Sequence, residues 1–171
     1  MTRLSAAQAG GPSVLAFLDM LAWSEGTSTI ASSDDGYNVL VGGSLFHDYS
    51  QHPRVSVALP RYGIRSTAAG RYQFLARTWD GLVQRYAFDG SFAPAAQDLA
   101  ALKLLEEYAA MPLIQAGRIE QAIARAAPIW ASLPGAGYGQ REQRLSALLA
   151  QYRDALAQQS GERQSDDGLR P

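Results

Sequence analysis

Hydrophobic positions recur at helical spacing near the start of the chain. Pro12 suits the first turn of a helix, and the apolar residues after it repeat every three or four positions until Gly26, a common helix stop. The repeating positions are Val14, Phe17, Leu18, Leu21 and Ala22. The pattern therefore predicts a helix that begins at Pro12 and ends just before Gly26.

The period changes in the next forty or so residues. Residues 37–41 form a short strand-like run before Gly42 and Gly43, and Val55, Val57 and Leu59 alternate with polar or small residues until Pro60. This part of the chain, residues 27–67, is predicted to form a small and irregular β lobe.

The helical period returns after Gly70. It predicts further helices over residues 72–86, from Pro94 to residue 109, over residues 118–127 and over residues 145–156. A β insertion between one helix and several others predicts an α+β, mainly α fold. Its two lobes, a helical bundle and a small irregular sheet, would have a cleft between them.

Length and composition describe an ordinary globular domain. With 171 residues, one domain over residues 12–158 is expected, with flexible termini at 1–11 and 159–171, where the chain is polar or small. The net charge of -1 gives no electrostatic reason for nucleic-acid binding. The apolar run 14–23 contains Asp19 and is too short to span a bilayer, and no signal peptide is evident. We therefore expect a protein made in the cytoplasm.

The sequence contains no pattern typical of a metal or cofactor site. The chain has no cysteine, and His47 and His52, its only histidines, match no structural zinc spacing. We expect no metal and no cofactor.

Glu25 is the candidate for a catalytic carboxyl. At 100° per residue it lies within about 20° of Val14, Leu18 and Leu21, so it points along the apolar face of the first predicted helix. Burial disfavours the charged form of a carboxyl, and so does the negative end of a helix dipole. A glutamic acid at this position is expected to keep its proton at higher pH than usual.

Five segments resemble the phage lambda-type endolysin family, and they occur in the same order as in that family. They are residues 17–26 (FLDMLAWSEG), 36–43 (GYNVLVGG), 48–54 (DYSQHPR), 66–73 (STAAGRYQ) and 129–140 (IWASLPGAGYGQ). The resemblance covers most of the chain and implies a lysozyme-like fold. It also implies that residues 55–65 and 133–141 form two lips over a sugar groove.

The resemblance implies a lytic transglycosylase that cleaves the β-1,4 bond between N-acetylmuramic acid and N-acetylglucosamine in peptidoglycan. Glu25 would be its one catalytic carboxyl, and the products would carry 1,6-anhydromuramic acid ends. Host lysis by such an enzyme implies a separate holin for release from the cytoplasm to the periplasm. A monomer is the default expectation.

Two alternatives remain open from the residues alone. A hydrolytic muramidase needs a second carboxylate, about 5–5.5 Å from the first for retention or roughly 6.5–9.5 Å for inversion. Asp34 or Asp35 could supply it, although both lie in a sequence typical of a solvated turn. The other alternative is a non-catalytic module that binds wall glycans.

Six further residues are candidates for substrate binding, each with a purely structural alternative. Gln73, expected at a helix start, and Tyr138, on a glycine-rich loop, are candidates for contacts to the sugar. The others are Tyr37, Gln140, Ser24 and Tyr72, of which Tyr72 also fits the apolar stripe of its predicted helix.

Overall fold

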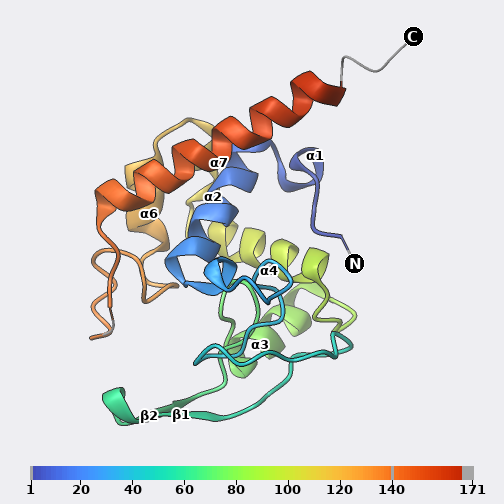
Figure 1. Cartoon of the computed structure of the whole chain (residues 1–171), viewed down its shortest axis with the longest axis vertical. Helices are drawn as coiled ribbons and strands as arrows, with labels where there is room; N and C mark the ends of the chain where they lie inside the picture. The colour runs from blue at the N-terminus through green and yellow to red at the C-terminus, as the bar shows by residue number, and fades with distance from the viewer. Residues whose placement is uncertain (1, 140, 167–171) are drawn as a thin grey trace.

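Helix α2 (Pro12–Ser24) runs through the middle of the molecule, and other helices pack around it (Figure 1). The structure, a computed structural model, describes residues 2–139 and 141–166. Pro12 occupies the first turn of α2, as the sequence predicts. The buried residues lie on every side of this helix rather than on one stripe: Val14, Leu15, Ala16, Phe17, Leu18, Met20, Leu21, Ala22 and Ser24. A helix that is apolar all round in this way is an internal one.

The remaining helices are α1 (Ala6–Ala9), α3 (Ala76–Tyr86), α4 (Pro94–Glu107), α5 (Met111–Gln115), α6 (Ile119–Ala126) and α7 (Leu145–Asp166). Periodicity predicts α4, α6 and the start of α7 closely. It misses the short α5, and it starts α3 four residues too early. Helix α7 lies across α2 and continues to Asp166, past the end at residue 156 that the pattern predicts (Figure 1). None of the described helices is both long enough and apolar enough to cross a membrane.

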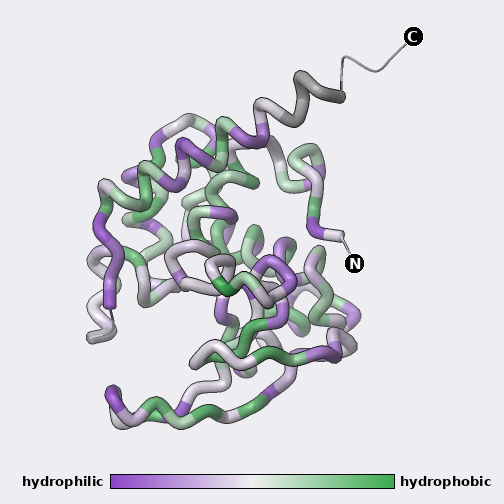
Figure 2. Tube along the Cα trace, viewed as in Figure 1, coloured by the Kyte–Doolittle hydropathy of each residue, from purple (hydrophilic) through white to green (hydrophobic). Residues whose placement is uncertain are grey.

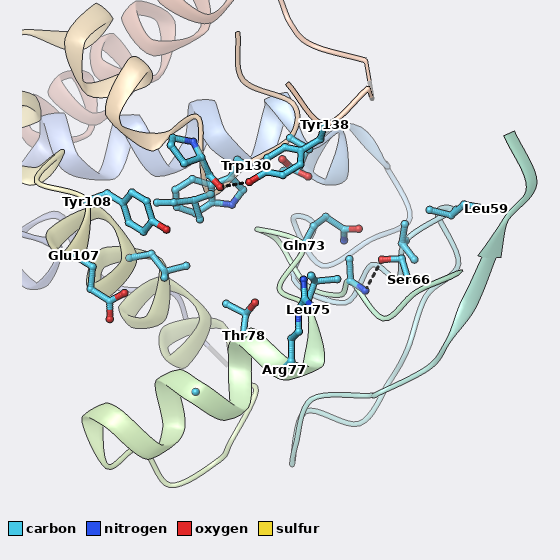
Figure 3. A pocket seen from close by; sticks show the side chains of 18 of the residues that line it. Leu59, Ser66, Gln73, Leu75, Arg77, Thr78, Glu107, Tyr108, Trp130 and Tyr138 are labelled. Atoms are coloured by element: carbon cyan, nitrogen blue, oxygen red, sulfur yellow. Dashed lines mark hydrogen bonds between the residues drawn. The ribbon is translucent and has the colours of Figure 1, made fainter. Parts of the chain in front are cut away.

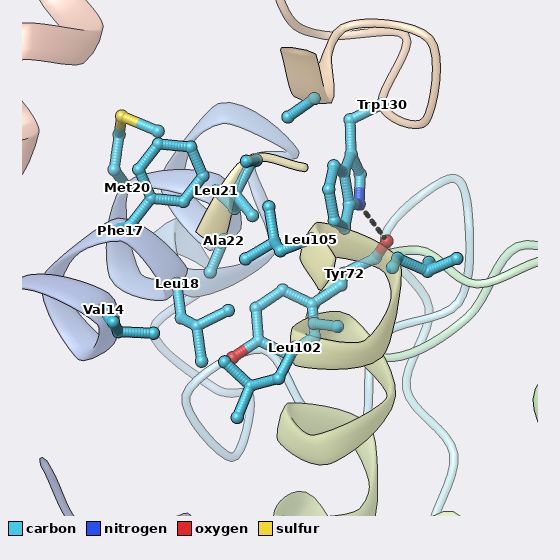
Figure 4. Packing of buried hydrophobic residues seen from close by; sticks show 14 of the residues in the cluster. Val14, Phe17, Leu18, Met20, Leu21, Ala22, Tyr72, Leu102, Leu105 and Trp130 are labelled. Carbon is cyan, nitrogen blue, oxygen red and sulfur yellow. Dashed lines mark hydrogen bonds between the residues drawn. The ribbon is translucent and has the colours of Figure 1, made fainter. Parts of the chain in front are cut away.

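The main core lies where α2 meets α4 and the loop segments around Tyr72 and Trp130 (Figure 4). Leu18 and Leu21 of α2 and Leu105 of α4 are almost completely buried there. The indole N–H of Trp130 donates a hydrogen bond of 3.1 Å to the carbonyl of Tyr72. Each such large apolar side chain contributes roughly 1.5–3 kcal/mol on burial, so this cluster fixes α2 relative to the rest of the chain.

The β lobe is smaller and more irregular than the sequence suggests. Strands β1 (Val57–Leu59) and β2 (Ile64–Ser66) pair antiparallel, and the short 3-10 turn η2 (Pro60–Tyr62) joins them. The hairpin extends away from the helices, and it mixes apolar with polar residues (Figures 1 and 2). Together with the helices, this small sheet gives the α+β, mainly α fold that the sequence predicts.

Residues 37–41 do not form the predicted strand. Val39 and Leu40 make only isolated bridges, to Leu45 and Ala69 respectively. The amide of Leu40 donates to the carbonyl of Ser44, because the chain reverses direction at the two glycines that follow. The run is apolar because it is buried, not because it extends along a sheet.

The N-terminal arm is packed onto the domain, contrary to the expectation of a loose segment. Ser5 and Gln8 form a capping box at the start of α1, and Arg3 makes an ion pair of 2.6 Å with Asp19. The amide of Leu4 donates to a carboxylate oxygen of Asp98, which is fully buried in α4. A buried carboxylate needs hydrogen-bond donors, and the arm supplies one of them.

Candidate active site

A pocket of about 640 Å³ opens between the two lobes, and Glu25 is part of its wall. The hairpin contributes Leu59 and Ser66, and the start of α3 contributes Arg77 and Thr78 (Figure 3). The opposite side is formed by residues 128–131 and by Tyr138 (Figure 3). The cleft that the sequence predicts between a β lobe and a bundle is therefore present, with the candidate carboxyl inside it.

The end of α2 places the Glu25 side chain at the pocket. Glu25 is the last residue with helical geometry, and its amide still donates to the carbonyl of Leu21. Gly26 then takes a left-handed conformation with φ 76°, which a glycine adopts without steric cost. The next residue, Thr27, donates its hydroxyl to the carbonyl of Arg71 at 2.6 Å and so ties this turn to the β lobe.

The surroundings of Glu25 favour its neutral form. Burial raises the pKa of Glu25 from the ordinary 4.5 to about 7, although hydrogen bonds from Ser132 act in the opposite direction. The Ser132 hydroxyl lies 2.6 Å from Glu25 Oε1. A carboxyl with this pKa can donate a proton near neutral pH and can also take one back.

We expect the pH dependence of activity to follow the proton on Glu25. Because the pKa is raised to about 7, Glu25 is mostly protonated below pH 7 and loses its proton as the pH rises through that value. If proton donation limits the rate, kcat should fall about tenfold per pH unit above pH 7. A pH–rate profile measured on purified peptidoglycan checks this. A profile that stays flat up to pH 9 would contradict it.

The two aspartates proposed as partners for hydrolysis do not line this pocket. Asp34 accepts a hydrogen bond from the hydroxyl of Tyr49, and Asp35 makes an ion pair of 2.6 Å with Arg71 on another face of the protein. Among the described residues, the other carboxyl in the pocket wall is Glu107, which is paired with Arg85 at 3.0 Å.

Gln73 and Tyr138 are the two binding candidates that line the pocket with Glu25 (Figure 3). Gln73 is not at a helix start: it lies in a tight turn with φ 51°, and its amide nitrogen donates to the carbonyls of Val39 and Gly70. Those bonds leave the side-chain oxygen for a ligand. Tyr138 is 57% exposed, and its hydroxyl donates to the carbonyl of Pro128 at 2.6 Å. One ring face can therefore meet a sugar while the hydroxyl fixes the loop.

Tyr37 and Tyr72 lie in the core rather than in the pocket. They are 3% and 1% exposed, and both hydroxyls donate to the same oxygen of Asp98, at 2.8 and 2.6 Å. Burial raises the pKa of both phenols, and the neighbouring Asp98 carboxylate adds to the effect. These tyrosines hydrogen-bond a buried carboxylate, and neither lines the pocket that contains Glu25.

The other two binding candidates have different outcomes. Ser24 is buried behind Glu25, where its hydroxyl contacts the Leu21 carbonyl and Ser132 instead of the open pocket. Gln140 lies outside the described residues.

A buried arginine joins the two lobes away from the pocket that contains Glu25. Arg71 is fully enclosed, pairs with Asp19 of α2 at 2.8 Å and with Asp35 of the β lobe, and lies over the ring of Tyr37 at 5.0 Å. The backbone carbonyl of Arg71 accepts the hydrogen bond from the Thr27 hydroxyl described above. These contacts fix the segment around Asp35 and Tyr37 relative to α2, the helix that leads to Glu25.

Sequence reasoning misses Ser132 as a partner of Glu25. The two residues are 107 positions apart, and no local pattern connects them. Pocket residues on α3, such as Arg77 and Thr78, are missed as well, because they lie on the polar side of an amphipathic helix and look like solvent-exposed positions.

Histidine and acidic residues do not gather into a metal site in the described part of the chain. His52 is buried, accepts the Arg54 amide on Nδ1 at 3.1 Å, and contacts the carbonyl of Phe74 through Nε2 at 2.8 Å. Burial lowers the pKa of this histidine. It is a neutral structural residue that fixes the loop.

Comparisons with known proteins agree with this fold and pocket. A model of the endolysin family matches residues 15–159. The endolysin of Escherichia phage lambda is 50% identical over 143 residues, which cover 82% of this chain and 89% of that protein. The endolysin of Escherichia phage P2 is 46% identical over 152 residues, or 83% and 92% of the two chains.

Solved structures give the same result in three dimensions. Bacteriophage lambda lysozyme complexed with a chitohexasaccharide matches with a TM-score of 0.80 at 46% identity, covering 91% of this chain and 97% of that one. A second structure of lysozyme from bacteriophage lambda matches with a TM-score of 0.76 at 44% identity and the same coverage. On both sequence and structure, the chain belongs to the endolysin family.

Proposed function

We propose that this endolysin cleaves the β-1,4 bond between N-acetylmuramic acid and N-acetylglucosamine by lytic transglycosylation. Family membership makes it a peptidoglycan-cleaving enzyme of cell-wall lysis. The observation that carries the finer mechanism is that Glu25 shares its pocket with one other described carboxyl, Glu107, which is paired with Arg85. Glu25 is half-buried in the pocket wall with a pKa of about 7, and neither Asp34 nor Asp35 lines that pocket.

One carboxyl is enough if the substrate supplies its own nucleophile. Protonated Glu25 donates its proton to the glycosidic oxygen as the bond to the anomeric carbon breaks. The resulting carboxylate then takes the proton from the 6-hydroxyl of the muramic acid as that oxygen closes a 1,6-anhydro ring. Ring closure within one sugar benefits from effective molarity, and Glu25 ends the cycle protonated again.

The pocket suits a glycan strand that is held between two walls. The hairpin β1–β2 forms one wall, and the loop that carries Tyr138 forms the other. Glu142 closes that loop by accepting the amides of Gly135 and Gly137, each at 3.0 Å. We assign Tyr138 to stacking on a sugar face and the Gln73 side-chain oxygen to an N-acetyl N–H. The related lambda enzyme, whose structure holds a chitohexasaccharide, supports a glycan in this groove.

The mass of the released muropeptides tests the mechanism. Transglycosylation should give only anhydro-ended products, which are lighter by one water than the reducing-end products of a muramidase. Digestion of purified peptidoglycan, followed by mass spectrometry, distinguishes the two, with a hydrolytic muramidase run as a control. Reducing ends alone would overturn the transglycosylase proposal and favour hydrolysis.

The biological setting follows from the family. We propose that the chain is made in the host cytoplasm, acts on the wall from the periplasm and depends on a holin for release during phage-induced lysis. We also propose that it works as a monomer, because Glu25, Gln73 and Tyr138 all come from one chain. A non-catalytic, glycan-binding role is the remaining alternative, and loss of lysis in a Glu25 variant separates it from the enzyme.

A further inference from the structure

Two buried serines connect Glu25 to the backbone of its own helix. Ser132 Oγ lies 2.6 Å from Glu25 Oε1, Ser24 Oγ lies 2.9 Å from Ser132 Oγ, and Ser24 Oγ lies 2.8 Å from the carbonyl oxygen of Leu21. Both serines are almost completely buried. The four oxygens form one unbranched chain with three gaps of hydrogen-bond length.

The number of protons in this chain changes with the state of Glu25. Each serine hydroxyl supplies one proton, and a neutral Glu25 supplies a third. With Glu25 protonated, all three gaps are filled if Glu25 donates to Ser132, Ser132 to Ser24, and Ser24 to the Leu21 carbonyl. With Glu25 ionised, Ser132 can turn to donate to the carboxylate and Ser24 can donate to Ser132. The Leu21 carbonyl then keeps its helical bond from the Glu25 amide.

We infer that Ser132 and Ser24 are positioning residues that support both protonation states of Glu25, by reversing the direction of their hydrogen bonds as its proton leaves and returns. The inference rests on the proposed role of Glu25 as acid and then base. It explains how one buried carboxyl can change charge twice in a cycle without moving. Neither serine gains or loses a proton during the reaction. Only the directions of their hydrogen bonds change.

The scaffold behind the serines is rigid enough for this role. Ser132 follows the buried Trp130 and precedes the fully buried Leu133, and its carbonyl accepts the amide of Gln143 at 2.7 Å. Ser24 is the last residue of α2. Neither backbone needs to move when the hydroxyls rotate.

No described charged side chain is hydrogen bonded to Glu25 in competition with the serines. The titratable groups that line the same pocket are Arg77 and Arg85 on α3, Glu107 and Tyr108 at the end of α4, and Tyr138 on the loop. Arg85 and Glu107 are paired with each other, and Tyr138 is bonded to Pro128. The two serines therefore dominate the polar surroundings of the carboxyl.

The two serines should affect Glu25 in opposite directions. Ser132→Ala removes the hydroxyl donor to the carboxylate and keeps the backbone amide, so the ionised form loses the larger of the two hydrogen bonds from Ser132 and the pKa of Glu25 should rise by about one unit. Ser24→Ala leaves that donor in place. It removes two hydrogen bonds of the neutral form, from Ser132 to Ser24 and from Ser24 to the Leu21 carbonyl, but only one of the ionised form, from Ser24 to Ser132. The pKa of Glu25 should therefore fall, by about half a unit.

An NMR titration of the full-length protein with ¹³C-labelled glutamate measures these changes without substrate. Loss of the Glu25 signal in the Glu25→Gln variant assigns it. Ser132→Thr, which keeps the hydroxyl, should restore the wild-type value, and Ser50→Ala on an exposed loop is the matched control. In kinetics, Ser132→Ala should lower kcat about tenfold with little change in KM, since the serine acts through Glu25.

Shifts of opposite sign, with rescue by threonine, would support the inference. Shifts of the same sign, or no shift in either variant while both remain folded by circular dichroism, would overturn it. This outcome is independent of the mechanism of bond cleavage: anhydro-ended products with no shift would remove the serines from their role and leave the transglycosylase proposal standing.

Discussion

Glu25→Gln is expected to abolish peptidoglycan cleavage, with a fall in rate of at least about 10³-fold, while the protein remains folded. General acid–base catalysis by one group is typically worth about 10²–10⁴-fold, and here one carboxyl would serve in both steps. The amide has nearly the same size as the neutral carboxyl but cannot donate an acidic proton. Release of soluble muropeptides measures the rate, and pull-down with insoluble peptidoglycan shows that binding remains. A variant with wild-type lysis would remove Glu25 from the mechanism.

The same substitution should stabilise the protein at high pH. The pKa of Glu25 is about 7 in the folded protein and near 4.5 in an unfolded chain. Ionisation of Glu25 therefore lowers the free energy of unfolding. The effect is absent below pH 4.5, grows between pH 4.5 and 7, and is complete above pH 7. Because the side chain is partly exposed, the gain from Glu25→Gln at pH 8 should be no more than about 2–3 kcal/mol. Urea unfolding at pH 4 and pH 8 checks this, and equal gains at both pH values would contradict it.

Gly70→Ala is expected to destabilise the protein by more than about 3 kcal/mol. Gly70 has φ 79°, and an added Cβ would lie 2.3 Å from Gln97 Oε1 and 2.8 Å from Phe92 Cζ. Gln97 cannot yield easily: it is fully buried, accepts the amide of Arg71 at 2.9 Å, and donates to the carbonyls of Tyr37 and Phe92. The substitution combines backbone strain with overpacking of a satisfied polar side chain.

Gly117→Ala is the matched control for that experiment. Gly117 has φ 73°, close to that of Gly70, but nothing lies within 4 Å of the position that an added Cβ would take. This substitution should cost only the left-handed strain, about 1–2 kcal/mol. Chemical denaturation of both variants gives the difference. Equal losses would show that the packing around Gln97 adds nothing.

The parts of the fold that follow from local pattern could be predicted from the sequence. Helices α2 and α4 begin at prolines and carry apolar residues at helical spacing, so their limits depend on nearby residues only. Glu25 could be found in the same way, because its direction follows from its place at the end of α2. Family resemblance added the overall lysozyme-like arrangement.

What the sequence could not give depends on contacts between distant segments. Tyr37 and Tyr72 resemble groove residues until the structure places Asp98 between them, 61 and 26 positions away along the chain. The partnership of Ser132 with Glu25 is of the same kind. No periodicity encodes which buried acid a hydroxyl will meet, since that depends on the packed fold.

Three distant segments of the chain donate hydrogen bonds to the carboxylate of Asp98, and this couples their unfolding. This carboxylate accepts hydrogen bonds from the amide of Leu4 in the N-terminal arm and from the hydroxyls of Tyr37 and Tyr72, which come before and after the β1–β2 hairpin in the chain. Detaching any one of them leaves a buried charge with fewer donors, so the remaining contacts weaken together. The first residues of the chain are thus expected to unfold together with the buried core around Asp98 rather than to open on their own.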